Sequence, residues 1–143
     1  MDITLTCIRD VLRRSLGQDS FTAGFVSQVI EDPSIPTACI TMSGELRFNP
    51  DFVATYVRTQ VERFCLIFHE LLHPAFGHFI HPADEIASIA CDAIINAIVT
   101  QVFAEPSGGG SLFLSLYPER GLSALLRPFS KMGHSSYQLL YRE

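Results

Sequence analysis

Charge is scarce in this chain of 143 residues, and lysine is almost absent. Charged residues make up 17% of the sequence, the formal net charge is −5, and Lys131 is the only lysine among ten basic residues. An acidic chain without a basic patch argues against nucleic acid as a partner. No unbroken apolar run reaches about 18 residues, so we expect no membrane span. The first residues show neither the basic nor the apolar region of an export signal, which predicts a cytoplasmic protein.

No two of the four cysteines stand close enough in the sequence to form a Cys-x-x-Cys pair. Zinc knuckles need such pairs, because two ligands must come from one turn of the chain. Cytosolic thiols stay reduced, so we interpret the cysteines as small buried apolar residues. Cys65 has a second interpretation, as a thiol close to a metal, because it precedes His69 by one helical turn. The full set is Cys7, Cys39, Cys65 and Cys91.

Apolar residues make up 48% of the chain, which is too many for a disordered protein. The length fits a single domain over residues 1–143, and no internal repeat is visible. The spacing of apolar residues predicts helices over 3–16 and 20–31, within an N-terminal segment that ends at residue 36. With the elements that follow, this predicts a mainly helical α+β fold.

The middle of the chain combines a hairpin with the longest helix. Two apolar runs flank Ser43-Gly44-Glu45, which predicts a β-hairpin over residues 37–49. Asn49 is suited to cap a helix and Pro50 to begin it, so we expect an active-site helix over 50–79. This helix is apolar on nearly every face, as buried helices are.

The last part of the chain is also predicted to be helical. A second apolar helix is expected over 83–104, between two prolines. The glycines at 108–110 then form either a connection or a flap. Short helices are expected within 112–143, near 121–127 and 135–142.

The residues most indicative of chemistry are His69-Glu70-Leu71-Leu72-His73, within the buried helix. Histidines four residues apart lie on one face of a helix, so both imidazoles can bind one zinc ion. Glu70 points away from His69 and can accept a proton from a metal-bound water, acting as general base. The alternative is a pair of hydrogen-bonded core histidines, which is an unusual choice for an apolar helix without a cation.

A catalytic zinc ion needs a third protein ligand, for which the sequence offers three candidates. Asp92 lies in the second apolar helix, where a lone carboxylate is costly to bury without a cation. Asn96 follows one turn later on the same face and can orient Asp92. His78 is the second candidate and Glu85 the third, although a glutamate at a helix start also suits the helix dipole. Pro74 disfavours helical geometry at His73, so the helix is expected to kink or end there.

These residues resemble a metallopeptidase domain family that often lies upstream of a von Willebrand factor A-like domain, in bacterial genes near MoxR-type ATPases. The resemblance covers residues 37–143, and its order of motifs is more specific than the histidine motif alone. The matching residues are Leu46 to Phe52, His69 to His73, Gly77-His78, Ala90 to Asp92 with Asn96, and more weakly Gly133 to Leu140.

The resemblance implies a small gluzincin-like (zincin) fold and a zinc metallopeptidase that hydrolyses peptides or proteins. His69, His73 and Asp92 then resemble the metal ligands and Glu70 the catalytic base. A hairpin strand, Ala38–Ser43 or Glu45–Phe48, resembles the strand that binds substrate, which points to Ile40, Thr41 and Met42. The von Willebrand-like domain is absent from this chain, so a separately encoded regulatory protein or a second copy of the chain is a candidate partner.

Two further questions stay open from the sequence. An oxyanion donor is expected, with Tyr117, His134, Tyr137 and Tyr141 as candidates. A protein without turnover is the alternative function, in which His78 joins the other three ligands and closes the zinc site. In such a binding module the metal only stabilises the fold.

Overall fold

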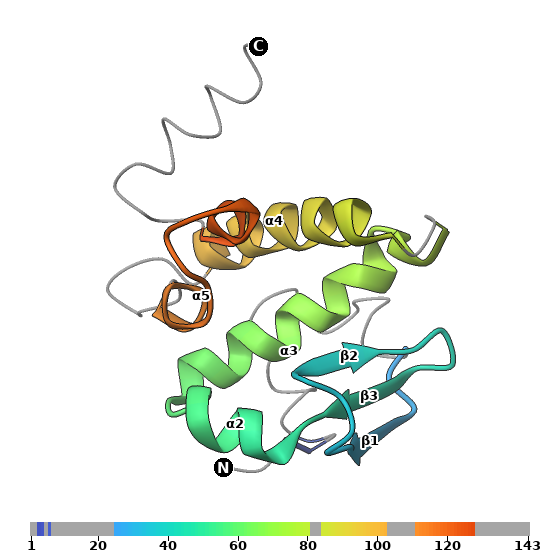
Figure 1. Cartoon of the computed structure of the whole chain (residues 1–143). Helices are drawn as coiled ribbons and strands as arrows, with labels where there is room; N and C mark the ends of the chain where they lie inside the picture. The colour runs from blue at the N-terminus through green and yellow to red at the C-terminus, as the bar shows by residue number, and fades with distance from the viewer. Residues whose placement is uncertain (1–2, 5, 7–24, 81–83, 103–110, 128–143) are drawn as a thin grey trace.

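The computed structural model describes residues 3–4, 6, 25–80, 84–102 and 111–127 (Figure 1). The helices expected over 3–16 and 135–142 lie outside the described residues, apart from the first few positions of the former. The glycines at 108–110 also lie outside them. The described part is a mainly helical α+β fold, which confirms the coarse fold class.

A three-stranded sheet forms one side of the structure, with strand order β1-β3-β2. Strands β2 (Ala38–Ile40) and β3 (Glu45–Phe48) are antiparallel, which confirms the predicted hairpin. Strand β1 (Gln28–Glu31) pairs with β3 in parallel, so the helix predicted over 20–31 is wrong at its end. The helix prediction rested on too few apolar positions, and the adjacent β-branched Val29 and Ile30 favour a strand.

A glycine at the hairpin turn lets β1 approach β3. Gly44 has a φ of +81°, and its carbonyl accepts a hydrogen bond of 2.8 Å from the backbone N–H of Ser27. A Cβ at this position would lie 2.0 Å from the carbonyl oxygen of Phe25. Only glycine therefore fits both the turn and the neighbouring chain.

Two helices occupy the stretch predicted as one helix over 50–79. Helix α2 (Pro50–Tyr56) begins as expected, with the Asn49 side chain accepting from the N–H of Asp51 and of Phe52. Helix α3 (Gln60–Ala75) begins separately, with a reciprocal capping box between Thr59 and Glu62. This box satisfies orphan N–H groups at a new helix start, which explains the break.

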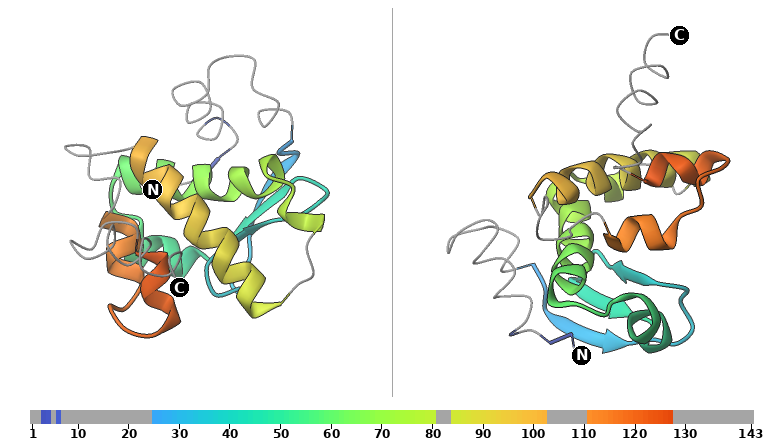
Figure 2. Two further views of the ribbon diagram at one scale, coloured as in Figure 1. Left: turned by 90° about the horizontal axis from the view of Figure 1, so that it is seen from above. Right: turned by 90° about the vertical axis from the view of Figure 1, so that its left-hand side faces the viewer.

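The remaining elements pack around α3. Beyond it lie the short 3₁₀ helix η2 (His78–Ile80), α4 (Glu85–Val102), α5 (Ser111–Leu116) and the 3₁₀ helix η3 (Leu122–Leu126). Helix α4 lies on one side of α3 and the sheet on the other (Figure 2). The buried positions of α3, such as Ile67, Phe68 and Leu71, are the centre of the apolar core. Burial on several sides is what its near-continuous apolar sequence predicted.

One described helix, α4, is long and apolar enough to span a membrane by length and composition alone. These two criteria do not separate a membrane helix from a helix of a protein core. Asp92 and Asn96 interrupt its apolar sequence, and both take part in contacts with α3. The absence of a membrane span therefore stays a prediction.

Candidate metal centre

Helix α3 brings His69, Glu70 and His73 to one buried place. His69 is 8% exposed and Glu70 is 6% exposed, so both are held away from solvent. The helix continues through Pro74 to Ala75, so both histidines lie on regular helix. Of the two outcomes expected for Pro74, a kink or a helix end at His73, the helix end is wrong, because α3 continues for two more residues. Proline removes one hydrogen bond to the carbonyl of Glu70, and this is tolerated close to the helix end.

Helix α4 supplies the third member of the group. The Asp92 Oδ1 atom lies 3.5 Å from His69 Nε2 and 3.3 Å from His73 Nε2. The two Nε2 atoms lie 3.2 Å apart. His69, His73 and Asp92 thus form a group that could hold a metal ion.

The spacing of these three atoms fits a tetrahedral ion. Zinc binds imidazole nitrogen at about 2.0–2.1 Å, and at a tetrahedral angle this places two ligand atoms about 3.3–3.4 Å apart. The observed separations are 3.2, 3.3 and 3.5 Å. Three electron-pair donors that converge so closely repel one another unless a proton or a metal ion lies between them.

Asn96 fixes the orientation of His69. Its Oδ1 lies 2.8 Å from His69 Nδ1, while its Nδ2 donates to the carbonyl of Leu126 at 3.0 Å. Because Nδ2 is engaged with a carbonyl, Oδ1 must be the acceptor and His69 Nδ1 carries the proton. His69 Nε2 is then left unprotonated toward Asp92, as a metal ligand requires. The sequence predicted that Asn96 orients Asp92, whereas in the structure its side-chain oxygen contacts His69 on the neighbouring helix.

His78 lies behind His73 and not beside Asp92. Its Nδ1 is 3.1 Å from His73 Nδ1, whereas His73 Nε2 faces Asp92. Gly77 makes this possible, since its φ of +67° turns the chain back after α3 ends. His78 is therefore placed to orient His73 and not to complete a ring of four ligands.

Glu70 is next to the group but does not belong to it. The backbone N–H of Ile40 donates a hydrogen bond to its carboxylate. Burial raises the pKa of Glu70 above its ordinary value, although His69 and His73 act against this shift. A buried carboxylate with a raised pKa is a suitable proton acceptor near neutral pH.

The charges of the group are strongly coupled. Burial acts to raise the pKa of Asp92, but hydrogen bonds from His69 and His73 outweigh it and hold that pKa well below its usual range. Burial acts to lower the pKa of His69, yet the nearby Asp92 and Glu70 raise it overall. Both directions show that Asp92 and the histidines stabilise the charged form of one another.

A cavity of about 450 Å³ opens at this group, and strand β2 forms one of its walls. Thr37 and Thr41 bond their backbone groups to β3, so by alternation those of Ala38 and Ile40 point to the other edge. No strand among the described residues pairs with that edge. Strand β2 ends at Ile40, so the predicted strand was too long and Thr41 and Met42 belong to the turn. Met42 still lines the cavity, while 75% exposed.

The other candidates fall into three classes. Tyr117 lines the cavity, and burial followed by the charge of Asp92 raises its pKa to about 12. Glu85 is exposed at the start of α4, and Cys65 is fully buried, so neither joins the described group. Burial raises the pKa of Cys65 to about 12, which keeps it a thiol. His134, Tyr137 and Tyr141 lie outside the described residues.

Several residues that line the cavity were not predicted from the sequence to lie near the site. Phe113 and Leu116 come from a stretch, 112–118, whose structure the sequence leaves ambiguous. Cys39 and Cys91 line the cavity from β2 and α4, although the sequence predicted only buried apolar roles for them. The alternation of β2 could have flagged its edge positions, but nothing in the sequence places α5 against α3.

Comparison of the chain with protein-family models, with curated proteins and with solved structures gave no match. The resemblance to the metallopeptidase family therefore stays a hypothesis.

Proposed function

We propose that this protein is a zinc-dependent metallopeptidase, with a fold like that of the gluzincins. The observation that carries the proposal is the triangle of donor atoms from His69, His73 and Asp92, with sides of 3.2, 3.3 and 3.5 Å. Two imidazoles and one carboxylate on two adjacent helices are a typical donor set for catalytic zinc. A bound zinc ion supplies a Lewis acid and lowers the pKa of water at its open position to about 7.

The residues around the triangle have distinct tasks in this proposal. Asn96 and His78 hold the two imidazoles in orientation, each through Nδ1. His69, His73 and Asp92 would hold the ion, and His78, which lies behind His73, would leave one position free for water. An open position is what separates a catalytic zinc site from a closed structural one.

Glu70 performs the proton transfers. It accepts a proton from the attacking water as the new C–O bond forms at the scissile carbonyl. When the C–N bond breaks, Glu70 returns that proton to the leaving amine, so one water is consumed and no charge is left over. The hydrogen bond from the Ile40 N–H keeps the carboxylate directed toward the cavity.

The substrate is an extended peptide in this proposal. Apart from the Ile40 N–H, which donates to Glu70, the outward backbone groups of β2 have no partner strand among the described residues, and a peptide can add there as a further strand. Tyr117 keeps its proton at neutral pH because its pKa is raised to about 12. Its hydroxyl can donate to the carbonyl oxygen that becomes negative during attack.

The test combines metal analysis with a matched pair of variants. We expect one zinc ion per chain in the purified wild type, and Glu70→Gln should retain it while losing cleavage of a peptide library by about 10²–10⁴-fold. Glu85→Gln is the control, because this glutamate is exposed on α4. Wild type that binds zinc but cleaves nothing dependent on Glu70 would contradict the proposal and favour a binding module.

A further inference from the structure

The main chain at Tyr117, which directly follows α5, is held by an arginine from the end of η3. Nη1 of Arg127 donates to the carbonyl of Leu114 at 2.8 Å and also to the carbonyl of Tyr117. Both carbonyls lie at the C-terminal end of α5, where a helix has no partners of its own for such groups. Arg127 therefore closes the end of this short helix beside a residue that lines the cavity.

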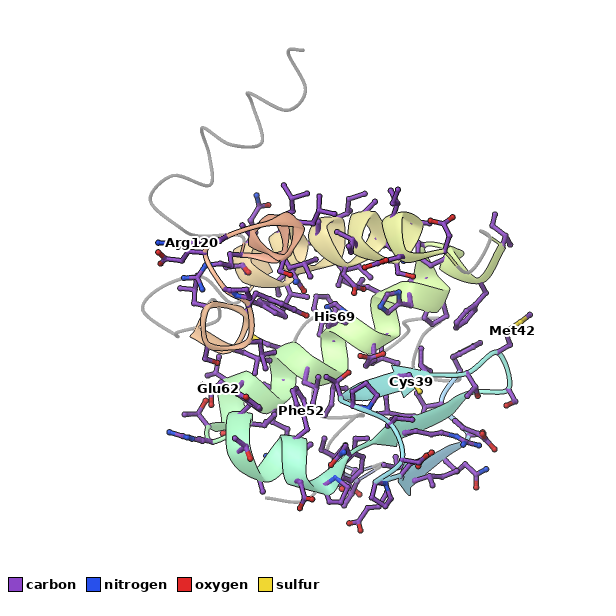
Figure 3. The ribbon with its side chains drawn as sticks, viewed as in Figure 1. Cys39, Met42, Phe52, Glu62, His69 and Arg120 are labelled. Carbon is purple, nitrogen blue, oxygen red and sulfur yellow. The ribbon has the colours of Figure 1, made fainter. Side chains whose placement is uncertain are left out.

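The loop that joins α5 to η3 is not held in place by burial. Residues 118–122 are all exposed, and Figure 3 marks Arg120 of this loop together with His69 of the site. Nη2 of Arg127 also donates to Glu119 at 3.1 Å, but Glu119 is 77% exposed, so this ion pair contributes little. The Arg127 side chain itself is only 12% exposed, and its bonds to the two carbonyls are the stronger attachment of the loop.

The residue before Arg127 is attached to the metal-binding group. The carbonyl of Leu126 accepts from Asn96 Nδ2 at 3.0 Å, while Oδ1 of the same amide contacts His69. The Tyr117 side chain is hydrogen-bonded to Asn96 as well. Two adjacent residues of the chain thus hold Asn96 and Tyr117, and together they fix the Tyr117 hydroxyl relative to His69.

On the basis of the proposed function, we infer that Arg127 is a positioning residue for Tyr117, the donor to the developing oxyanion. Arg127 is not among the described residues that line the cavity, so it acts through the main chain of Tyr117 and not on the substrate. A guanidinium suits this task because one of its nitrogens reaches two carbonyls while the other bonds elsewhere, in a fixed plane. Misplacing a group at the site by about 1 Å can lower the rate by about 10²-fold. Loss of Arg127 is therefore expected to be seen in kcat.

The first experiment is a double-mutant cycle, measured on peptide cleavage by the zinc-loaded protein. Arg127→Ala should lower kcat by about 10²-fold with little change in KM. The double variant with Tyr117→Phe should be no slower than Tyr117→Phe alone, because the arginine acts only through the tyrosine. Arg127→Lys keeps a donor there and should be faster than Arg127→Ala. Full activity of Arg127→Ala, or losses that multiply in the double variant, would overturn the inference.

The cycle has a matched control in the same loop. Arg120→Ala should keep the kcat of the wild type, because Arg120 is an exposed arginine. Unchanged zinc content and melting temperature show that each variant is folded. If Arg127→Ala does not fold, Arg127→Lys replaces it in the cycle, and its smaller loss of kcat must also vanish when Tyr117→Phe is present.

A binding measurement gives a readout that does not depend on turnover. Calorimetry compares a phosphinic peptide, whose anionic tetrahedral group resembles the oxyanion, with a product peptide that has no such group. Arg127→Ala should bind the phosphinic peptide about 10- to 100-fold more weakly than the wild type and the product peptide equally well. Equal affinity of both proteins for the phosphinic peptide would overturn the inference and leave the proposed function intact. The absence of any Glu70-dependent cleavage by the wild type would overturn the proposed function and the inference together.

Discussion

Two of the walls of the cavity differ in how their side chains are held in place. Asp92 and both histidines, on the wall formed by α3 and α4, are each held by a polar contact to another side chain. A second wall, which we call the apolar wall, consists of Phe52 from α2 and Leu112, Phe113 and Leu116 from α5. These side chains are held by packing alone, and the Phe113 ring also contacts His69 of the first wall. Hydrogen bonds fix direction to within tenths of an ångström, whereas packing fixes shape. The first wall therefore fixes the direction of the donor atoms, and the second fixes the shape of the cavity.

The largest effect should follow removal of a metal ligand from the polar wall. In Asp92→Ala the triangle loses its only carboxylate, and zinc affinity should fall by more than the roughly 10–100-fold that loss of an orienting residue costs. Competition with a chelator and metal content per chain measure this loss. Gln101→Ala, an exposed change on the same helix, should leave affinity unchanged. Unaltered zinc binding in Asp92→Ala would remove Asp92 from the ligand set.

Tyr117 tests whether a residue that directly follows α5 also takes part in the chemistry. Tyr117→Phe should lower kcat by about 10²–10³-fold, because the donor to the developing oxyanion is lost. KM and zinc affinity should change little, which separates this role from simple packing. Tyr56→Phe is the control, since Tyr56 lies on α2 and does not line the cavity. A loss of zinc affinity in Tyr117→Phe would instead assign the hydroxyl to support of Asn96.

Loss of an orienting residue should have a smaller effect, and one that is seen in metal binding. Asn96→Ala removes the acceptor for His69 Nδ1, and zinc affinity should fall by about 10–100-fold. Asn96→Asp keeps an acceptor there and should retain more of the affinity. If both variants bind zinc as wild type does, His69 is oriented by the helix alone. The comparison of the walls predicts no such loss for Leu116→Ala.

The pH dependence should differ between the metal-free and metal-bound chains. In the metal-free chain the pKa of His69 is raised, so its contribution to stability is complete below the ordinary value of 6.5 and is lost as pH rises through the folded pKa. Metal binding has the opposite trend, because the imidazoles must be deprotonated. The increase in melting temperature on adding zinc should therefore be larger at pH 7.5 than at pH 5.5. An increase that does not vary with pH would argue against histidine ligation.

The sequence predicted the polar wall better than the apolar one. Spacing on a helix places His69 and His73 on one face, and the cost of burying Asp92 alone points to a cation. These are local arguments, and the group in the structure agrees with them. The apolar wall depends on the packing of α5 against α2 and α3. No local sequence pattern specifies which apolar residues of these helices meet in the fold.

The errors in the predicted secondary structure also have physical causes. The helix predicted over 20–31 ends as β1 because pairing with β3, a distant segment, decides its structure. The sequence predicted one helix over 50–79, whereas the structure has two. The prediction missed the break because apolar residues continue on both sides of Val57. The signal was available in the Thr59-x-x-Glu62 capping box.

The capping box gives the smallest expected effect and serves as the reference for both walls. Thr59→Ala removes the side chain that accepts from the Glu62 N–H at 3.1 Å, and should lower the free energy of unfolding by about 1 kcal/mol. Chemical denaturation measures this loss, and Thr55→Ala on the exposed side of α2 should change stability by no more than about 0.5 kcal/mol. Because the box lies at the start of α3, more than two turns before His69, zinc affinity and substrate preference should both be unchanged. A shift in either one would mean that stability at the helix start reaches the cavity, and the two walls could then no longer be treated as independent of the rest of α3.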